Sequence, residues 1–114
     1  MRYFPIRAGV AMIGLLAGAS AALAASAENG KRVFIQRGCW QCHGTVGQGG
    51  AAGPRIAPDP LPYETLSAFV RTTNRAMPPY REAVLPEADL ADVYAYLQSI
   101  PKPPAVDSVP LLKR

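Results

Sequence analysis

The stretch Cys39-Trp40-Gln41-Cys42-His43 decides how this chain can fold, because it holds both cysteines and the only histidine of the 114 residues. A Cys-x-x-Cys pair can act as a redox dithiol, supply two ligands to zinc, close a disulfide, or anchor a covalent haem. Each of these roles needs a different surrounding sequence. The flanking residues therefore choose between them.

Three of the four roles lack the context that they require. A thioredoxin-like dithiol opens a helix after a strand, and no alternating apolar pattern here is long enough to predict a sheet. A structural zinc site takes about four Cys or His ligands, so Cys39, Cys42 and His43 would have to recruit a carboxylate. A disulfide between the two cysteines would restrain the unfolded chain very little, because the loop that it closes is so short.

The fourth role fits the spacing. Two thiols three positions apart on a turn can each add to one of the two vinyl groups on neighbouring haem rings. The residue that follows, His43, then lies directly over the iron and supplies an ordinary axial nitrogen ligand. The motif therefore predicts one haem c, covalently bound at Cys39 and Cys42.

Residues 1–24 have the composition of a secretory signal peptide. The two basic residues come first, residues 8–23 are apolar or small, and Ala24 and Ala27 each end a small-x-small tripeptide that suits cleavage. An uncleaved membrane anchor is the alternative, since roughly 20 apolar residues can span a bilayer. We expect a periplasmic or otherwise exported bacterial protein, bound to the membrane only if this segment is not cleaved.

The chain without its signal peptide is small and weakly charged. The net charge of +4 falls to +2 when Arg2 and Arg7 are removed, because ten basic residues then face eight acidic ones. Two haem propionates would cancel this charge. The sequence also has no run of Lys and Arg of the kind that binds along a phosphate backbone, so we expect no nucleic acid partner. About 90 residues give an apolar core of marginal stability, which the haem would complete.

Helical periodicity occurs near both ends of the expected domain. Residues 28–37 place Gly30 and Phe34 on one helical face, and Gly38 follows as a stop signal. Because glycine costs about 1 kcal/mol in a helix relative to alanine, Gly30 predicts close packing with another helix. Residues 87–100 form a second such segment. Its apolar stripe comprises Leu90, Val93, Tyr94, Leu97 and Ile100.

The sequence between these two segments alternates loop and helix. Residues 44–62 contain nine Gly or Pro, which excludes a helix or a central strand and predicts a long loop. Residues 63–75 repeat Leu66, Phe69, Val70 and Thr73 at helical spacing. Met77-Pro78-Pro79-Tyr80 is non-helical because of its prolines. The predicted class is all-α with long loops.

Met77 is the candidate for the second axial iron ligand. It is the only methionine outside the expected signal peptide, it lies in a rigid Pro-rich loop, and no second histidine competes with it. A methionine more often fills a gap in a core, but this context favours the ligand role. A thioether opposite an imidazole raises the reduction potential, as in cytochromes that carry electrons.

In these motifs and their order, the chain resembles the class I cytochromes c, small mono-haem proteins that carry electrons. The resemblance covers about residues 28–100. It rests on Gly30 and Phe34, the Cys39–His43 motif, Gly53-Pro54, Met77-Pro78 and the stretch from Tyr94 to Leu97. It implies an all-α fold of three to four helices, with long loops wrapped around a covalent haem.

The resemblance also implies particular contacts. The first and last helices would cross where Gly30 and Phe34 meet Tyr94 and Leu97. The carbonyl of Pro54 would accept a hydrogen bond from the ring nitrogen of the histidine that does not bind iron, and so fix its tautomer.

The predicted organisation is a signal peptide (1–24), a cytochrome c domain (25–101) and an extended, Pro-rich tail (102–114). The apolar residues of the tail would either pack on the domain itself or dock on a partner as an extended peptide.

The functional hypothesis is a periplasmic electron carrier and not an enzyme. It would pass single electrons between a dehydrogenase or respiratory donor and a downstream cytochrome or oxidase. A dedicated haem subunit of a larger oxidoreductase is the alternative. A haem peroxidase or gas sensor is disfavoured, because it needs an open iron site and a distal base, and the chain has no second histidine.

Overall fold

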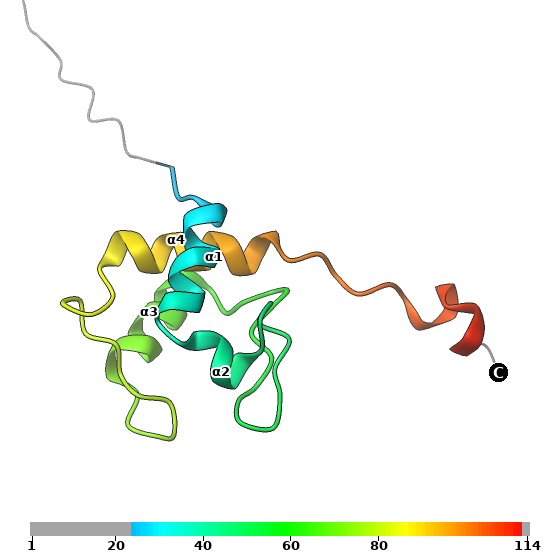
Figure 1. Cartoon of the computed structure of the whole chain (residues 1–114), viewed down its shortest axis with the longest axis horizontal. Helices are drawn as coiled ribbons and strands as arrows, with labels where there is room; N and C mark the ends of the chain where they lie inside the picture. The colour runs from blue at the N-terminus through cyan, green and yellow to red at the C-terminus, as the bar shows by residue number, and fades with distance from the viewer. Residues whose placement is uncertain (1–23, 113–114) are drawn as a thin grey trace, which may run out of the picture.

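The computed structural model describes residues 24–112, which contain four α-helices and two short 3-10 turns (Figure 1). These elements are α1 (Ala27–Gln36), α2 (Cys39–His43), α3 (Tyr63–Thr72), α4 (Glu87–Ser99), η1 (Val106–Ser108) and η2 (Pro110–Leu112). Within this part of the chain the β-structure is limited to an isolated bridge between Gly50 and Gly53. The all-α class is confirmed. Residues 1–23 of the expected signal peptide lie outside the described range.

The crossing of α1 over α4 forms the centre of the fold (Figure 1). A Cβ atom at Gly30 would lie 1.8 Å from the carbonyl oxygen of Asp92, so only glycine permits this approach of the two backbones. Phe34 is fully buried beside it, and its ring centroid lies 5.5 Å from that of Tyr96. The buried core at the crossing comprises Val33, Phe34, Leu90, Val93, Tyr96 and Leu97. The close packing expected at Gly30 is confirmed.

The predicted aromatic partner of Phe34 was wrong, because Tyr96 and not Tyr94 packs against it. Tyr94 instead lies against Tyr63 of α3, with the ring centroids 5.2 Å apart and the rings edge to face. Positions i and i+2 of a helix lie roughly 200° apart around its axis, so these tyrosines occupy different faces. α4 therefore uses one tyrosine for α1 and the other for α3.

The start of α1 is fixed to α4 by polar contacts. The Ser26 hydroxyl caps the helix by accepting a hydrogen bond from the Asn29 N–H at 3.2 Å. The Ser26 N–H and the Asn29 side-chain amide donate to the two carboxylate oxygens of Asp92, each at 2.6 Å. The hydrogen bond from the Asn29 side chain lowers the pKa of Asp92 most, and the hydrogen bond from the Ser26 N–H lowers it further.

α3 begins after Pro62, as predicted, but ends at Thr72, three residues before the predicted end. In a longer helix the Val70 carbonyl would accept from residue 74, whereas here it accepts from the Tyr80 N–H at 2.9 Å. The returning chain therefore replaces the next helical turn. Val70 and Thr73 are buried as expected, but Phe69 remains 47% exposed.

The tail runs away from the helical domain after Pro101 (Figure 1). Lys102 pairs with Asp59 at 3.1 Å, and beyond it Val106 and Leu111 are 68% and 94% exposed. The tail forms the short turns η1 and η2 and is not extended throughout. Its apolar side chains do not pack on the domain, so the first of the two predicted roles does not hold in this structure.

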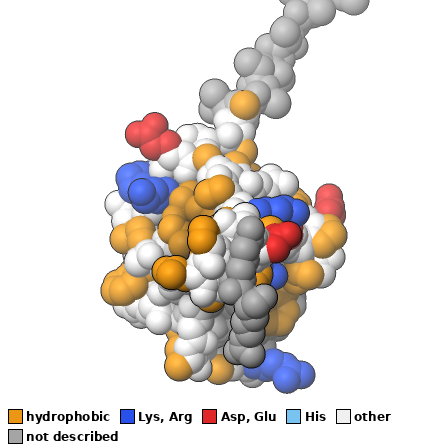
Figure 2. All heavy atoms as spheres, turned by 90° about the vertical axis from the view of Figure 1, so that its right-hand side faces the viewer, with side chains coloured by type: hydrophobic (Ala, Val, Ile, Leu, Met, Phe, Trp, Pro, Cys, Tyr) orange, Lys and Arg blue, Asp and Glu red, His pale blue; other side chains and the backbone are white. Residues whose placement is uncertain are grey.

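The face from which the tail leaves shows hydrophobic side chains with a few charged side chains of both signs among them (Figure 2). No basic patch dominates the part of that face which the figure colours. No helix in residues 24–112 combines the length and the apolar character that crossing a bilayer requires.

Candidate haem site

The Cys39–His43 motif forms α2, a helix of little more than one turn. Gly38, with φ of +78°, ends α1 and redirects the chain into the motif, as its predicted role as a stop signal requires. Cys39 is half-buried against the core, whereas Cys42 is exposed. Both thiols are free. The two sulfurs are thus displayed from one helical turn in different surroundings.

His43 is buried, with 8% of its surface exposed, and its Nδ1 atom lies 2.8 Å from the carbonyl oxygen of Pro54. A carbonyl can only accept a hydrogen bond, so Nδ1 carries the proton. In this neutral tautomer the lone pair is on Nε2, which becomes the coordinating atom of the ring. The contact expected between His43 and Pro54 is present.

The long loop of residues 44–62 holds Pro54 in position through backbone contacts. The Gly49 N–H donates to the His43 carbonyl at 2.7 Å, and Gly50 and Gly53 form a bridge that closes the turn between them. A Cβ atom at Gly53 would lie 3.0 Å from the Cys42 carbonyl oxygen. The loop backbone therefore lies directly against α2, which explains why this segment is rich in glycine.

The start of this loop is bound to α4. The Tyr96 hydroxyl donates to the Thr45 carbonyl at 2.9 Å, and the Ile56 and Ala57 N–H groups both donate to the Gly47 carbonyl. The helix that packs on α1 thus also fixes the start of the loop beside α2. The position of the His43 ring is in this way coupled to the central helix crossing.

The surroundings of Cys39 disfavour redox and zinc chemistry. Burial raises the pKa of the Cys39 thiol to about 11, so it stays protonated near neutral pH. A reactive dithiol needs a lowered thiol pKa, since the thiolate is the nucleophile and the metal ligand. Within residues 24–112, no three His, Cys, Asp or Glu side chains converge on a position that could hold a metal ion.

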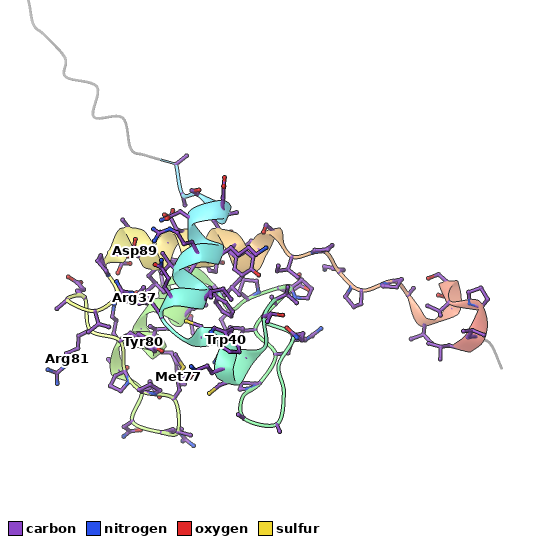
Figure 3. The ribbon with its side chains drawn as sticks, in the orientation of Figure 1. Arg37, Trp40, Met77, Tyr80, Arg81 and Asp89 are labelled. Atoms are coloured by element: carbon purple, nitrogen blue, oxygen red, sulfur yellow. The ribbon has the colours of Figure 1, made fainter. Side chains whose placement is uncertain are left out.

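Met77 lies in the segment 73–86 that joins α3 to α4. Its side chain is half-buried and packs against the hydrophobic core. In Figure 3 it lies between its own loop and α2, which bears Trp40 and the two cysteines. The structure thus places the predicted thioether ligand on the side of its loop toward the haem-attachment motif.

These residues fit a haem. Two free thiols, an imidazole with its Nε2 lone pair available and a half-buried thioether form the set of donors that such a group requires. Trp40 on α2 and Phe69 on α3 leave 40% and 47% of their surfaces exposed.

No sequence pattern indicated a role for Arg71, which organises the segment that carries Met77. Its side chain is only 16% exposed, and its Nη1 atom donates to the carbonyls of Tyr80 at 2.8 Å and Leu85 at 2.6 Å. Its Nη2 atom lies 2.8 Å from a carboxylate oxygen of Glu87. An arginine in the last turn of a helix is usually solvated, so the sequence carries no signal for these contacts.

Besides Arg71, Glu87 contacts a second residue of α3, Tyr63. The Tyr63 hydroxyl donates to its other carboxylate oxygen. The hydrogen bonds from Tyr63 and Arg71 lower the pKa of Glu87. The pKa of Tyr63 is raised to about 12, mainly by burial and next by its hydrogen bond to Glu87. Pro86, which has no capping side chain, precedes α4, so these contacts hold the start of that helix.

Known proteins match most of the domain. Residues 25–97 match the family described as cytochrome C oxidase, cbb3-type, subunit III. The chain is 31% identical over 96 residues to cytochrome c-555 of Methylococcus capsulatus, and the alignment covers 77% of this chain and 78% of that protein. No solved structure matches. With the four α-helices of residues 24–112 and its Cys-x-x-Cys-His motif, the chain belongs to the class I c-type cytochromes, whose cofactor is covalently bound haem c.

Proposed function

We propose that this cytochrome carries single electrons in the periplasm, from a dehydrogenase or another respiratory donor to a downstream cytochrome or oxidase. The observation that supports this most directly is the His43 ring, whose Nδ1 donates to Pro54 and leaves Nε2 for iron. Met77, the only methionine of the described residues, would supply the second axial ligand. Two protein ligands leave no coordination position for a substrate, which favours a carrier over an enzyme.

In this proposal each site residue has a separate role. Cys39 and Cys42 form the covalent attachment, His43 and Met77 bind the iron, and Pro54 fixes the orientation of the imidazole. The bound haem supplies a one-electron ferric/ferrous couple. Covalent attachment at two cysteines keeps that couple in place while partners bind and leave.

Replacement of the thioether tests the proposal. Met77→His should keep the haem bound but lower the reduction potential, because imidazole stabilises ferric iron better than a thioether does. The weak far-red band of the ferric spectrum, which reports sulfur ligation, should disappear. Ala76→Ser, an exposed neighbour in the same loop, serves as the matched control and should change neither property. An unchanged potential in Met77→His would show that Met77 is not a ligand.

A dedicated haem subunit of a larger oxidoreductase is the second candidate. Two observations favour it: the matching family is described by an oxidase subunit, and the tail exposes apolar residues that the domain does not cover. The two functions differ in assembly. A subunit would co-purify with its complex after mild solubilisation, whereas a free carrier would elute alone at the mass of the mature chain.

We also propose that the signal peptide is cleaved after Ala24 and not after Ala27. The first turn of α1 depends on Ser26, which caps the helix and donates its N–H to Asp92. Cleavage after Ala27 would remove this residue and both contacts, whereas cleavage after Ala24 retains them. The intact mass of the exported holoprotein decides between the two, since the products differ by Ala25, Ser26 and Ala27.

A further inference from the structure

The loop that carries Met77 is closed at its base by the last turn of α3. It leaves that helix at Thr73 and returns at Tyr80, whose N–H donates to the Val70 carbonyl at 2.9 Å. The Tyr80 carbonyl accepts from Arg71 Nη1 at 2.8 Å. Both backbone groups of Tyr80 are therefore held by α3, and Met77 lies within the short loop that they close.

Arg71 extends this closure to the start of α4. The same side chain binds the Leu85 carbonyl and the Glu87 carboxylate, so one guanidinium links three points along the chain. Its planar fork of five N–H donors suits this geometry, whereas a lysine ammonium is a compact point charge on a flexible stem. A charge that is mostly buried requires such partners, since an unpaired one would be costly.

Tyr80 also ties the loop to the end of α1. Its hydroxyl donates to the Arg37 carbonyl at 2.9 Å, two residues before Cys39. In Figure 3 Tyr80 lies between Arg37 and Met77. The base of the Met77 loop is thus attached both to α3 and to the segment that leads into the haem-attachment helix.

The interior of the loop is stiff, because Pro78 and Pro79 follow Met77 directly and fix their own φ angles. The part of the loop between Met77 and Tyr80 therefore bends little, so the position of Met77 depends on the base that Tyr80 and Arg71 close. Closing a loop costs conformational entropy. Because the contacts of Tyr80 and Arg71 already hold the base of this loop closed, Met77 is pre-organised to bind.

We propose that Arg71 is a positioning residue for Met77: by closing the base of the loop, it opposes movement of the thioether away from the iron. This inference rests on the proposed role of Met77 as an axial ligand. It assigns to Arg71 an effect on ligand exchange that is separate from its effect on the stability of the whole fold.

Imidazole, a ligand that displaces methionine from ferric haem, tests the proposal on the intact holoprotein. Arg71→Gln should bind imidazole about tenfold more tightly than the wild type, equivalent to about 1.4 kcal/mol, as measured by loss of the far-red band. Arg71→Lys retains the charge but loses the planar guanidinium, so its imidazole affinity should rise less, by about threefold. This variant provides the test if Arg71→Gln does not fold.

The matched control is Asp92→Asn, which weakens the fold at the α1–α4 crossing without touching the Met77 loop. Its imidazole affinity should stay within about twofold of the wild type, while urea titration shows its lower stability. Arg71 variants that lose stability but bind imidazole as the wild type does would overturn the proposal.

The ligand assignment is tested separately by the ferric spectrum recorded before imidazole is added. A wild-type protein without the far-red band would overturn the role of Met77 and, with it, the positioning role of Arg71. A wild type with the band, together with unchanged affinity in both Arg71 variants, would overturn the positioning role alone.

Discussion

The α1–α4 crossing and the segment 73–86 that carries Met77 are stabilised in different ways. At the crossing, all six core side chains are at most 5% exposed, and Gly30 brings the two backbones into contact. In the segment 73–86 only Thr73 and Leu85 are buried, and hydrogen bonds from Arg71 and Tyr80 hold the rest. Protein side chains complete the packing at the crossing, whereas we expect the haem to complete the packing on the side of the domain that carries Met77.

The largest effect should come from removing the haem attachment. Cys39→Ala combined with Cys42→Ala should abolish covalent haem and leave a largely unfolded chain, because a domain of about 90 residues depends on the cofactor for much of its core. Far-UV circular dichroism of the purified protein measures this. Trp40→Ala, a change within the same motif that keeps both thiols, should retain the haem. Native helicity in the double variant would show that the crossing folds by itself.

A substitution at the crossing tests its close packing. Gly30→Ala should lower the free energy of unfolding by about 3 kcal/mol, because the new methyl group meets the Asp92 carbonyl and the helices must separate. Helix propensity acts in the opposite direction and favours alanine by about 1 kcal/mol. Lys31→Ala, an exposed position on the same helix, is the control and should change stability little in urea titration. A stabilised Gly30→Ala protein would contradict the close approach.

Local signals predicted the helical elements well. The 28–37 and 87–100 segments agree with α1 and α4 to within one residue at each end, because Gly38 and Pro101 stop them unambiguously. The motif and Gly53-Pro54 could be placed from spacing and resemblance alone. α3 was predicted too long, since its end depends on the Tyr80 N–H, a partner seven residues beyond Thr73.

Two features depended on tertiary structure and could not be predicted. α4 carries apolar residues on more than one face, so its periodicity could not decide whether Tyr94 or Tyr96 meets Phe34. The contacts of Arg71 involve backbone carbonyls of an irregular segment, whose course no sequence pattern describes. Both omissions concern the way in which the helices are joined and not whether they form.

Loss of the hydrogen bonds that Asp92 accepts from Ser26 and Asn29 at the edge of the crossing should have a smaller effect on stability, and this effect should depend on pH. Asp92→Asn should lower the free energy of unfolding by about 1 kcal/mol near neutral pH, since the ionised carboxylate accepts hydrogen bonds from Ser26 and Asn29. Because folding lowers the pKa of Asp92, this contribution is present above its ordinary value of 3.8 and is lost as the pH falls through the folded value.

Urea titrations at several pH values should therefore show the wild-type and Asp92→Asn curves converging in acid. Asp107→Asn, in the exposed tail, is the matched control and should give no difference at any pH. A constant difference between the Asp92 variant and the wild type down to strongly acidic pH would contradict the role of the ionised carboxylate.

The smallest effect on the domain should come from the tail, a third region that has neither the packing of the crossing nor the hydrogen bonds of the Met77 segment. Truncation after Lys102 keeps the ion pair with Asp59 and removes exposed residues such as Leu111. The haem spectrum and potential should stay the same, and the unfolding free energy should change by less than about 0.5 kcal/mol.

If the tail docks on the electron donor, its loss should appear in partner kinetics instead. Apolar side chains held away from the domain cost little to bury on another surface, and interface changes act mainly on the dissociation rate. Stopped-flow reduction by the proposed electron donor should therefore show faster dissociation of the truncated protein, and Leu111→Ser with Leu112→Ser should reproduce part of this change. A truncated domain that is destabilised but reacts normally would instead make the tail a structural clasp, and the docking role would fail.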